Sequence, residues 1–229
     1  MGDKMHIILF GPPGAGKGTQ ADSLVKDLNI IKISTGDLLR AEIEKGSNLG
    51  SEIKEIIDRG QLVPNNIISD LIKLKLESQN YRKRIIFDGY PRNILQAKDL
   101  DDQLLKNKQN ISLVISLHVN EKVVIKRILG RQVCSKCGLT FNEFSNLSTK
   151  NNHNCDKSFL KKRSDDNEKT IKKRFVVYNQ ETLPILNYYR KQNLLHEIDG
   201  MKEIGSIYKE IRAIIRPTEG WLYIAYSYK

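Results

Sequence analysis

Residues Gly11–Thr19 form a glycine-rich segment with one lysine, GPPGAGKGT. The apolar run Ile7–Phe10 precedes it, and the helix-compatible segment Gln20–Val25 follows. This order of strand, glycine-rich loop and helix is what a phosphate-binding loop requires. Glycines let backbone N–H groups turn inward, the helix start adds its dipole, and Lys17 offers a positive charge to the β- and γ-phosphates. The alternative, a glycine-rich turn without a ligand, is disfavoured because spacing, lysine and flanking elements agree.

The loop departs from the strict pattern at one position. A Ser or Thr normally follows the lysine and binds Mg²⁺, but here Gly18 follows Lys17, and the hydroxyl comes at Thr19. We therefore expect the loop to hold phosphates, with Mg²⁺ held mostly by phosphates and water. Asp88 is a second candidate near the metal, because it directly follows the apolar run Ile85–Phe87, and a strand-end carboxylate can hold a Mg²⁺-bound water. The competing interpretation is that Asp88 only caps a turn.

Arginines form the other informative set. Planar guanidinium groups bind phosphate bidentately and spread transition-state charge. Any one of them is more often a solvated surface residue. As a set beside a phosphate loop they predict a site for two phosphorylated substrates, and the candidates are Arg40, Arg92, Arg127, Arg131, Arg163 and Arg174.

The elements that must position these residues alternate between strands and helices. Five short apolar segments, rich in isoleucine and valine, predict strands covered on both faces. Alternation of this kind favours an α/β fold with a doubly wound parallel sheet. The expected strands are Ile7–Phe10, Ile31–Ile33, Arg84–Asp88, Leu113–His118 and Leu194–Ile198.

Two regions break the alternation. Residues 131–166 contain all three cysteines and many Asn and Ser residues, and they predict a small separate lobe. Near the C-terminus, Pro217 and Gly220 are expected to end the last helix. The tail that follows is aromatic and apolar, which favours packing on the core over a contact with another chain.

Composition limits the class of protein. The 229 residues are 39% hydrophobic and 28% charged, which is typical of a globular protein with one core and inserted lobes. No apolar run approaches the roughly 18 residues of a membrane helix, and the first expected strand leaves no room for a signal peptide. We expect a cytoplasmic location and no membrane partner. The net charge of +11 could indicate nucleic-acid binding, but the lysines are scattered, which favours nucleotide phosphates and solvated surface instead.

Taken together, these motifs resemble the adenylate kinases, nucleoside-monophosphate kinases of the type with a long lid. The resemblance runs from about residue 6 to about residue 215, and the order of its motifs is specific. The matching segments are Gly11–Thr19, Ile33–Arg40, Asp88–Arg92 with Gln96, Gly130–Val133, Arg163–Asp166 with Lys172–Arg174, and Asp199–Lys202.

The resemblance implies a P-loop core with two inserted lobes. The core would comprise residues 1–33, 64–129 and 167–215, the AMP-binding lobe 34–63 and the lid 130–166, with 216–229 a tail of unknown role. ATP would be held by Gly14, Ala15, Gly16, Lys17, Gly18, Thr19, Arg131, Thr140, Phe141 and Lys202. AMP would be held by Thr35, Arg40, Gln61, Leu62, Val63, Gly89, Tyr90, Pro91, Arg92, Gln96, Arg163 and Arg174. The catalytic set would be Lys17, Asp88, Arg92, Arg127, Arg131, Arg163 and Arg174.

The implied activity is reversible transfer of a phosphoryl group from Mg²⁺-ATP to AMP, giving two ADP. The acceptor is a phosphate oxygen that is already ionised at neutral pH, so no general base is required. Catalysis then depends on alignment, charge neutralisation and exclusion of water by closing lobes. The alternative is a relative of the same fold that prefers GTP, and the cysteines of the lid weigh towards ATP. A monomer is the family expectation. A mitochondrial intermembrane location stays open, since entry there needs no cleaved presequence.

The lid contains a possible zinc site. Cys134 and Cys137 form a C-x-x-C pair, and Cys155 follows later. Three cysteines are too few for a disulfide framework and point to metal or redox chemistry. In zinc-bearing lids of the family the fourth ligand lies three residues after the third, where this chain has Ser158, a poor ligand. His153 and Asp156 are the other candidates. The alternative is three free cysteines in a lid without metal.

Overall fold

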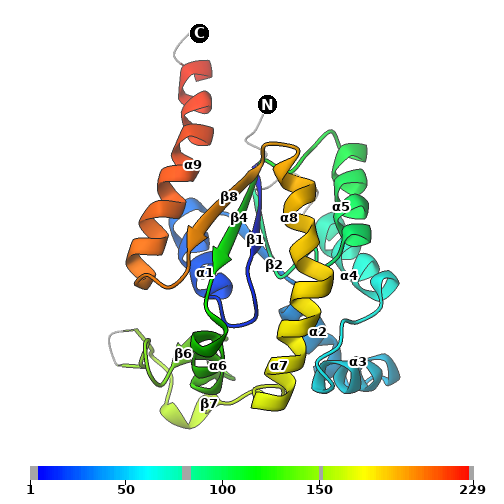
Figure 1. Ribbon diagram of the computed structural model, residues 1–229, viewed down its shortest axis with the longest axis vertical. Helices are drawn as coiled ribbons and strands as arrows, with labels where there is room; N and C mark the ends of the chain where they lie inside the picture. The colour runs from blue at the N-terminus through cyan, green and yellow to red at the C-terminus, as the bar shows by residue number, and fades with distance from the viewer. Residues whose placement is uncertain (1–4, 79–83, 150–151, 227–229) are drawn as a thin grey trace.

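The computed structural model describes residues 5–78, 84–149 and 152–226, with side chains up to Ile215. Its centre is a five-stranded sheet with all neighbours parallel, in the order β2-β3-β1-β4-β8 (Figure 1). The predicted doubly wound fold is confirmed, and each predicted strand lies within one residue of its observed bounds. These bounds are β1 His6–Phe10, β2 Ile31–Ser34, β3 Ile85–Asp88, β4 Leu113–His118 and β8 Leu195–Asp199.

Helices cover both faces of the sheet. Along β1 the side chains alternate, so that Ile8 and Phe10 face one hydrophobic cluster while Ile7 and Leu9 face the other. The first cluster packs against α4 (Asn65–Ser78), α5 (Ile94–Lys106) and α8 (Leu183–Arg190). The second packs against α1 (Lys17–Leu28) and α9 (Ile204–Tyr226). This double cover explains why the three central strands, β1, β3 and β4, are mostly apolar and buried, whereas the edge strand β8 carries exposed polar residues.

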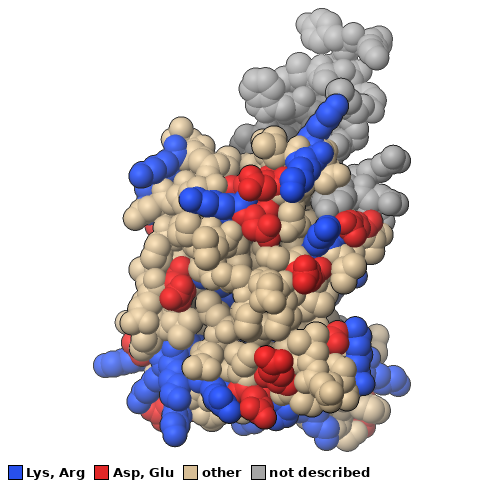
Figure 2. Space-filling view, turned by 90° about the vertical axis from the view of Figure 1, so that its right-hand side faces the viewer, with Lys and Arg blue, Asp and Glu red and all other residues tan. Residues whose placement is uncertain are grey.

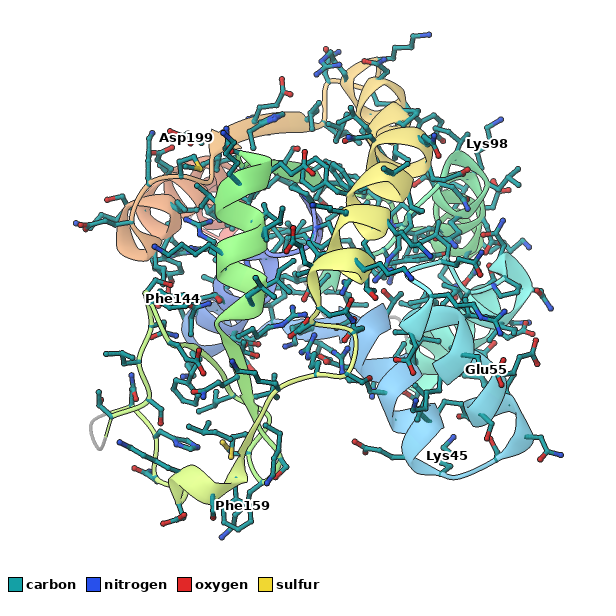
Figure 3. The ribbon with its side chains drawn as sticks, turned by 60° about the horizontal axis from the view of Figure 1, so that its bottom comes forward. Lys45, Glu55, Lys98, Phe144, Phe159 and Asp199 are labelled. Carbon is teal, nitrogen blue, oxygen red and sulfur yellow. The ribbon has the colours of Figure 1, made fainter. Side chains whose placement is uncertain are left out.

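Two segments extend beyond the carboxyl ends of the strands, at the bottom of Figure 1. One consists of α2 (Thr35–Glu44) and α3 (Asn48–Asp58). The other is a separate antiparallel sheet in the order β6-β5-β7, from β5 (Arg131–Cys134), β6 (Thr140–Asn142) and β7 (Leu160–Lys161), with the 3₁₀ turn η1 (Lys157–Phe159). In Figure 3 the labelled Phe159 belongs to the small sheet's lobe, and Lys45 and Glu55 belong to the helical lobe across from it.

Between these lobes runs a continuous helical rod. It begins with α7 (Glu168–Val177), passes through a π-helical turn, η2 (Tyr178–Thr182), and continues as α8. The helix α6 (Glu121–Leu129) packs against α7 through Val124, Ile128 and Ile171. The rod therefore connects the lid segment to the core.

The prediction that Pro217 and Gly220 end the last helix is wrong, because α9 continues to Tyr226. A proline removes one backbone hydrogen bond and costs ~3 kcal/mol within a helix, but it does not forbid continuation of a helix already formed. The residues before it, Ile207, Ile211 and Ile215, already pack on the sheet. The predicted packing of the tail on the core concerns side chains of 216–229, which lie outside the described ones.

Charges on the surface are mixed. On the face shown in Figure 2, basic and acidic side chains are interspersed among uncharged residues, and basic side chains gather at the lower left. No helix within the described residues is long and apolar enough to cross a membrane.

Candidate active site

The phosphate loop follows β1 directly and runs into α1. Gly14 and Gly16 take left-handed backbone angles, with φ of +78° and +94°, which favour glycine. A Cβ at Gly14 would lie 2.7 Å from a side-chain carbon of Ile128, so a larger residue cannot fit there without displacement. Lys17 Nζ donates to the carbonyl oxygens of Gly11 and Pro12, at 2.8 and 3.0 Å. The ammonium group of Lys17 is thus held by backbone carbonyl oxygens at the start of the same loop.

The charges around Lys17 explain its electrostatic state. Burial lowers the pKa of Lys17 to about 8, Asp88 opposes this shift, and Arg92, Arg174 and Arg131 add to it. Burial likewise raises the pKa of Asp88, while Lys17 and Lys32 pull it down. Lys17, at the start of α1, and Asp88, at the end of β3, are both half-buried and attract each other, and the arginines around them leave excess positive charge for an anionic phosphate.

Gly18 brings Asp88 close to the start of α1. A Cβ added at Gly18 would lie 3.4 Å from Asp88 Oδ2. Gly18, which stands where a Ser or Thr is usual, thus leaves room for the carboxylate of Asp88 at the end of β3. The Asp88 carboxylate therefore lies beside the start of α1, next to the phosphate loop.

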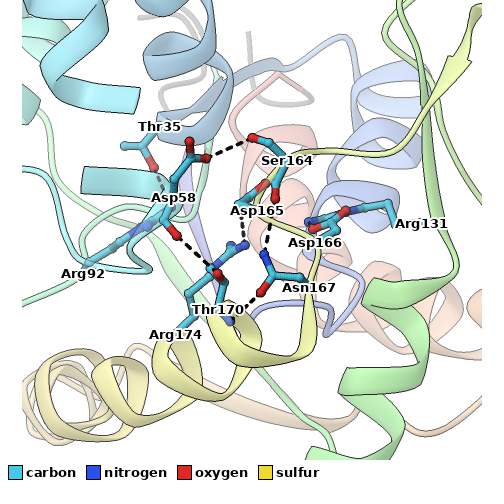
Figure 4. Close-up of polar contacts among 10 residues, drawn as sticks. All are labelled: Thr35, Asp58, Arg92, Arg131, Ser164, Asp165, Asp166, Asn167, Thr170 and Arg174. Carbon is cyan, nitrogen blue, oxygen red and sulfur yellow. Dashed lines mark hydrogen bonds and ion pairs between the residues drawn. The ribbon is translucent and has the colours of Figure 1, made fainter. Parts of the chain in front are cut away.

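Arg92 lies at a corner shared by three elements. Its Nε donates to Gly89 O at 2.8 Å, and its Nη2 lies 3.4 Å from Thr35 Oγ1 (Figure 4). Thr35, at the start of α2, also donates to Gly89 O at 2.8 Å. Burial and the neighbouring Arg174 lower the pKa of Arg92 to about 10, against Asp88. The guanidinium is thus fixed in place and lacks full charge compensation from the protein.

Hydrogen bonds among three side-chain amides, those of Gln96, Asn65 and Asn93, support the Arg92 corner. Gln96 Oε1 accepts from the Arg92 N–H at 2.8 Å, and Gln96 Nε2 donates to Asn65 Oδ1 at 2.8 Å. Asn93 caps α5 and donates to the same Asn65 oxygen at 2.9 Å. Gln96 is buried, so its position is set by hydrogen bonds rather than by solvent.

The remaining arginines reach the site from the lid and from α7. Arg131 is paired with Asp166 by two hydrogen bonds, and Arg174 Nη1 donates to Asp165 Oδ2 at 2.6 Å (Figure 4). Burial, together with Arg131 and Arg40, lowers the pKa of Arg163 to about 10. Neighbouring acids thus orient two of the cations, and the crowding of like charges favours an anionic ligand.

The end of α3 contacts the segment that leaves the lid. Ser164 Oγ donates to Asp58 Oδ1 at 3.0 Å, and Thr170 Oγ1 donates to Asp58 O at 3.2 Å (Figure 4). Gly60, which follows the C-cap of α3, has φ of +74° and lies against Thr170. Asp58 thus joins the helical lobe to Ser164 and to the start of α7 on one side of the site.

The phosphate loop, Asp88, the Arg92 corner and the remaining arginines line one cleft of about 930 Å³, near the upper end of the usual range for ligand sites. Every residue predicted for the nucleotide sites lines it except Tyr90. The Tyr90 ring is fully buried in the core, and its hydroxyl lies 3.4 Å from Gln96 O. Arg127 lines the cleft with its Nη1 bonded to Gly200 O at 2.9 Å, and Lys202 lines it while paired to Glu210 at 2.6 Å.

Sequence reasoning assigned no role to several cleft residues. Asp165 and Asp166 belong to the matching segment Arg163–Asp166. Two adjacent acids in a chain with several candidate phosphate-binding arginines are the signal for the observed pairs with Arg174 and Arg131. Lys32 lines the cleft and is paired with Asp22 at 2.6 Å. Tyr178 and Thr182 line it from the π-helical turn, for which the sequence gives no signal.

The lid brings four potential metal ligands together. The ligand atoms of Cys134, Cys137, His153 and Cys155 lie within 4.8 Å of one another. Asp156 instead caps the 3₁₀ turn, where its Oδ1 accepts from Ser158 N–H at 2.8 Å. Of the three candidates for a fourth ligand, His153 is the one that the structure places in the group.

The chemistry of this group fits a zinc ion. Ser148 Oγ lies 2.8 Å from His153 Nδ1, which fixes the ring and leaves Nε2 for a metal. Burial acts to raise the pKa of Cys134, but hydrogen bonds from the Cys137 backbone, His153 and the Lys136 backbone outweigh it and lower the pKa to about 6. Burial and the sulfurs of Cys137 and Cys134 raise the pKa of Cys155 to about 11. A divalent cation would relieve that repulsion, and three sulfurs with one imidazole nitrogen are a common structural zinc set.

Comparison with known proteins decides the family. The family model for adenylate kinase matches residues 9–194. The adenylate kinase of Pelagibacter ubique is 44% identical over 212 residues, covering 93% of this chain and 100% of that protein. The chain belongs to the adenylate kinase family. The adenylate kinase of Archaeoglobus fulgidus is 41% identical over 213 residues, 92% of this chain and 98% of that protein. That of Thermosipho melanesiensis is 42% identical over 214 residues, 93% and 100% respectively.

Membership in the adenylate kinase family makes the chain an enzyme that binds nucleotides and transfers phosphoryl groups. The alternative of a GTP-preferring relative receives no support from these matches, which are all named adenylate kinases. The matched region includes the phosphate loop from Gly11 onward, the Arg92 corner and the whole lid.

Proposed function

We propose that this protein transfers the γ-phosphoryl group of Mg²⁺-ATP reversibly to AMP, giving two ADP. The observation that carries the proposal is a single cleft lined by a phosphate loop on one side and by six arginines around it. An oxygen of the AMP phosphate attacks the γ-phosphorus, and the bond to the β,γ-bridging oxygen breaks. The acceptor oxygen carries no proton that must be removed, so the cleft needs cations and alignment rather than a base.

The donor side is assigned to the loop and the lid. The backbone N–H groups from Gly14 to Thr19 would hold the β- and γ-phosphates, with Lys17 at their centre. Thr140 and Phe141 of the small sheet, and Lys202 just before α9, would surround the adenosine, because all three line the cleft. Bound Mg²⁺ would neutralise phosphate charge, and Asp88 would orient its water.

The acceptor side is assigned to the Arg92 corner and the helical lobe. Arg92 and Arg40 would bind the AMP phosphate, and Thr35, Gln96 and the segment Gln61–Val63 would position the nucleoside. Arg163 and Arg174 would lie between the two substrates with Arg127 and Arg131 on the donor phosphates. The support is that the acids beside Arg131 and Arg174 orient them without neutralising the cluster.

The lobes are proposed to close over the substrates. In this scheme residues 34–63 form the AMP-binding lobe and 130–166 the lid, on a core of 1–33, 64–129 and 167–215. Closure would exclude water, which otherwise competes with AMP for the phosphoryl group. Asp58 bonds Ser164 across the two lobes and Thr170 on the core, so closure of either lobe would change these contacts.

A structural zinc ion is proposed for the lid, with Cys134, Cys137, His153 and Cys155 as ligands. It would hold the small sheet in shape and take no part in the chemistry, because four protein ligands would leave no open position on the ion for a substrate. We further propose a monomer in the cytoplasm that acts on free nucleotides and not on nucleic acid.

The deciding experiment is an initial-rate assay of nucleoside diphosphate formation with Mg²⁺. ATP or GTP is paired in turn with AMP, CMP, UMP or GMP. Fast turnover with ATP and AMP alone is expected. Faster transfer from GTP would overturn the donor assignment, and no transfer with any pair would overturn the proposed function.

A further inference from the structure

The search for a further functional residue leads to Thr182, in the π-helical turn. Its side chain is 7% exposed, and its Oγ1 donates to the backbone oxygen of Arg92 at 2.7 Å. Thr182 and Arg92 are 90 residues apart in sequence. The hydroxyl thus ties the helical rod to the corner that carries the acceptor-side arginine.

The π-helical turn gives Thr182 the right direction. Arg174 and Thr182 both line the cleft, and they lie eight positions apart on the rod. In a regular α-helix of 3.6 residues per turn, residues eight apart differ by about 80° around the axis. A π-helical turn absorbs one extra residue, so the two side chains face the same side, as residues seven apart normally do. The distortion therefore sets Thr182 and Arg174 on one face.

The bond from Thr182 completes the restraint of Arg92. The Arg92 N–H is held by Gln96 from α5, its Nε by Gly89, and its carbonyl oxygen by Thr182. Arg174, on the same rod as Thr182, is the neighbouring cation that contributes most to lowering the pKa of Arg92. The rod thus carries one arginine of the cleft, Arg174, and through Thr182 holds the backbone of a second, Arg92.

We infer that Thr182 is a positioning residue, which acts on phosphoryl transfer by fixing Arg92 relative to Arg174. In this role its hydroxyl acts through the Arg92 backbone, to which it is bonded. The inference rests on the proposed role of Arg92 at the acceptor phosphate. Since misplacement by a fraction of an ångström is costly when alignment is the main catalytic device, loss of this one hydroxyl will lower turnover.

The test compares Thr182→Val, which keeps the shape, with Thr182→Ser, which keeps the hydroxyl. We expect Thr182→Val to lower kcat about tenfold, because the Arg92 carbonyl loses its partner, with the KM for ATP unchanged. Thr182→Ser should remain close to wild type. Melting curves establish that each variant is folded, and Thr182→Ala replaces Thr182→Val if the valine does not fit.

A double-mutant cycle with Arg92→Ala separates positioning from a structural role. If Thr182 acts through Arg92, the valine substitution will change kcat by less than about twofold once Arg92 is absent. An undiminished tenfold loss in the Arg92→Ala background, or normal kcat in folded Thr182→Val, would overturn the inference. Failure of the proposed function looks different, because wild-type enzyme would then show no transfer from ATP to AMP.

Discussion

The core sheet and the small sheet of the lid are held together by different means. The core buries isoleucine, leucine, valine and phenylalanine on both faces of five strands. Among the described residues of 131–166, Cys134 and Phe141 are the buried apolar side chains, and the cysteines and His153 cluster beside them. A sheet of such short strands cannot bury enough apolar surface to be stable by itself. In the small sheet, four potential metal ligands thus lie where the central sheet has a hydrophobic core.

The cleft lies between these two regions and is lined by residues of both. Lys17, Asp88 and Arg92 are fixed by elements of the core, whereas Arg131, Thr140 and Phe141 belong to the small sheet. A change in the core group should therefore alter the chemical step itself. A change in the metal cluster should alter the lid and leave the core folded.

The largest expected effect is that of Arg92→Ala, in the core. We expect kcat to fall roughly 10²-fold or more, because a preorganised cation that stabilises developing charge is lost. Steady-state kinetics with ATP and AMP measure it. Arg59→Ala is the matched control, because Arg59 is exposed, pairs with Glu55 on α3 and is not among the residues that line the cleft. Normal turnover of folded Arg92→Ala enzyme would show that the acceptor side is assigned wrongly.

Next in size is the effect of His153→Ala, in the lid. We expect zinc content to fall from about one per chain to well below that, and kcat to fall roughly tenfold or less, because the lid residues lose their support. Metal analysis of protein purified without chelator and calorimetry measure both. The core transition should persist in calorimetry, which would separate the two regions directly.

Asp156→Ala provides the comparison for that experiment. Asp156 caps the 3₁₀ turn and is not part of the four-ligand group, so its loss should leave zinc bound. The reverse result, with zinc lost from Asp156→Ala and kept by His153→Ala, would exchange the two assignments. Wild-type protein with far less than one zinc per chain would remove the metal from the lid altogether.

The two regions also differ in how far the sequence predicts them. The core follows from local signals, since Ile7–Phe10 and the glycine loop after it can form little else, and parallel strands bring Asp88 beside that loop. In the lid the three cysteines predict a metal site, but the sequence leaves His153, Asp156 and Ser158 open. The choice depends on a turn that folds Asp156 back onto Ser158 N–H, a contact without a distinctive sequence signal.

Within the cleft, the arginines are recognisable as a set, but their partners are not. Arg131 pairs with Asp166 and Arg174 with Asp165 through folding of the chain between the lid and α7. The π-helical turn at Tyr178–Thr182 is equally hidden, because it satisfies tertiary contacts to Arg92 rather than local propensity. Pro217 shows the opposite error, in which a strong local signal did not end a helix.

The smallest expected effect is the pH dependence set by Lys17. Its pKa of about 8 in the folded protein lies below the ordinary value of 10.5, chiefly because of burial. We expect kcat/KM for Mg²⁺-ATP to fall several-fold above about pH 8, as the free enzyme loses the ammonium charge. The stability of the unliganded protein should change in the opposite sense. Between the two pKa values the unfolded chain binds more protons than the folded protein. The free energy of unfolding therefore increases, and the protein becomes more stable, as pH rises through this range.

This pH profile distinguishes the two regions once more. The charges that act most on Lys17, those of Asp88 and Arg92, come from the core, whereas Arg131 of the lid contributes least among the named neighbours. Removal of zinc by a chelator should therefore lower the rate at every pH without moving the alkaline limb. The arginine of Lys17→Arg keeps its charge over this pH range. This variant should have a lower rate than the wild type but should not show the fall of kcat/KM above about pH 8. A limb that persists in Lys17→Arg, or that shifts with zinc, would assign it to a group of the lid instead.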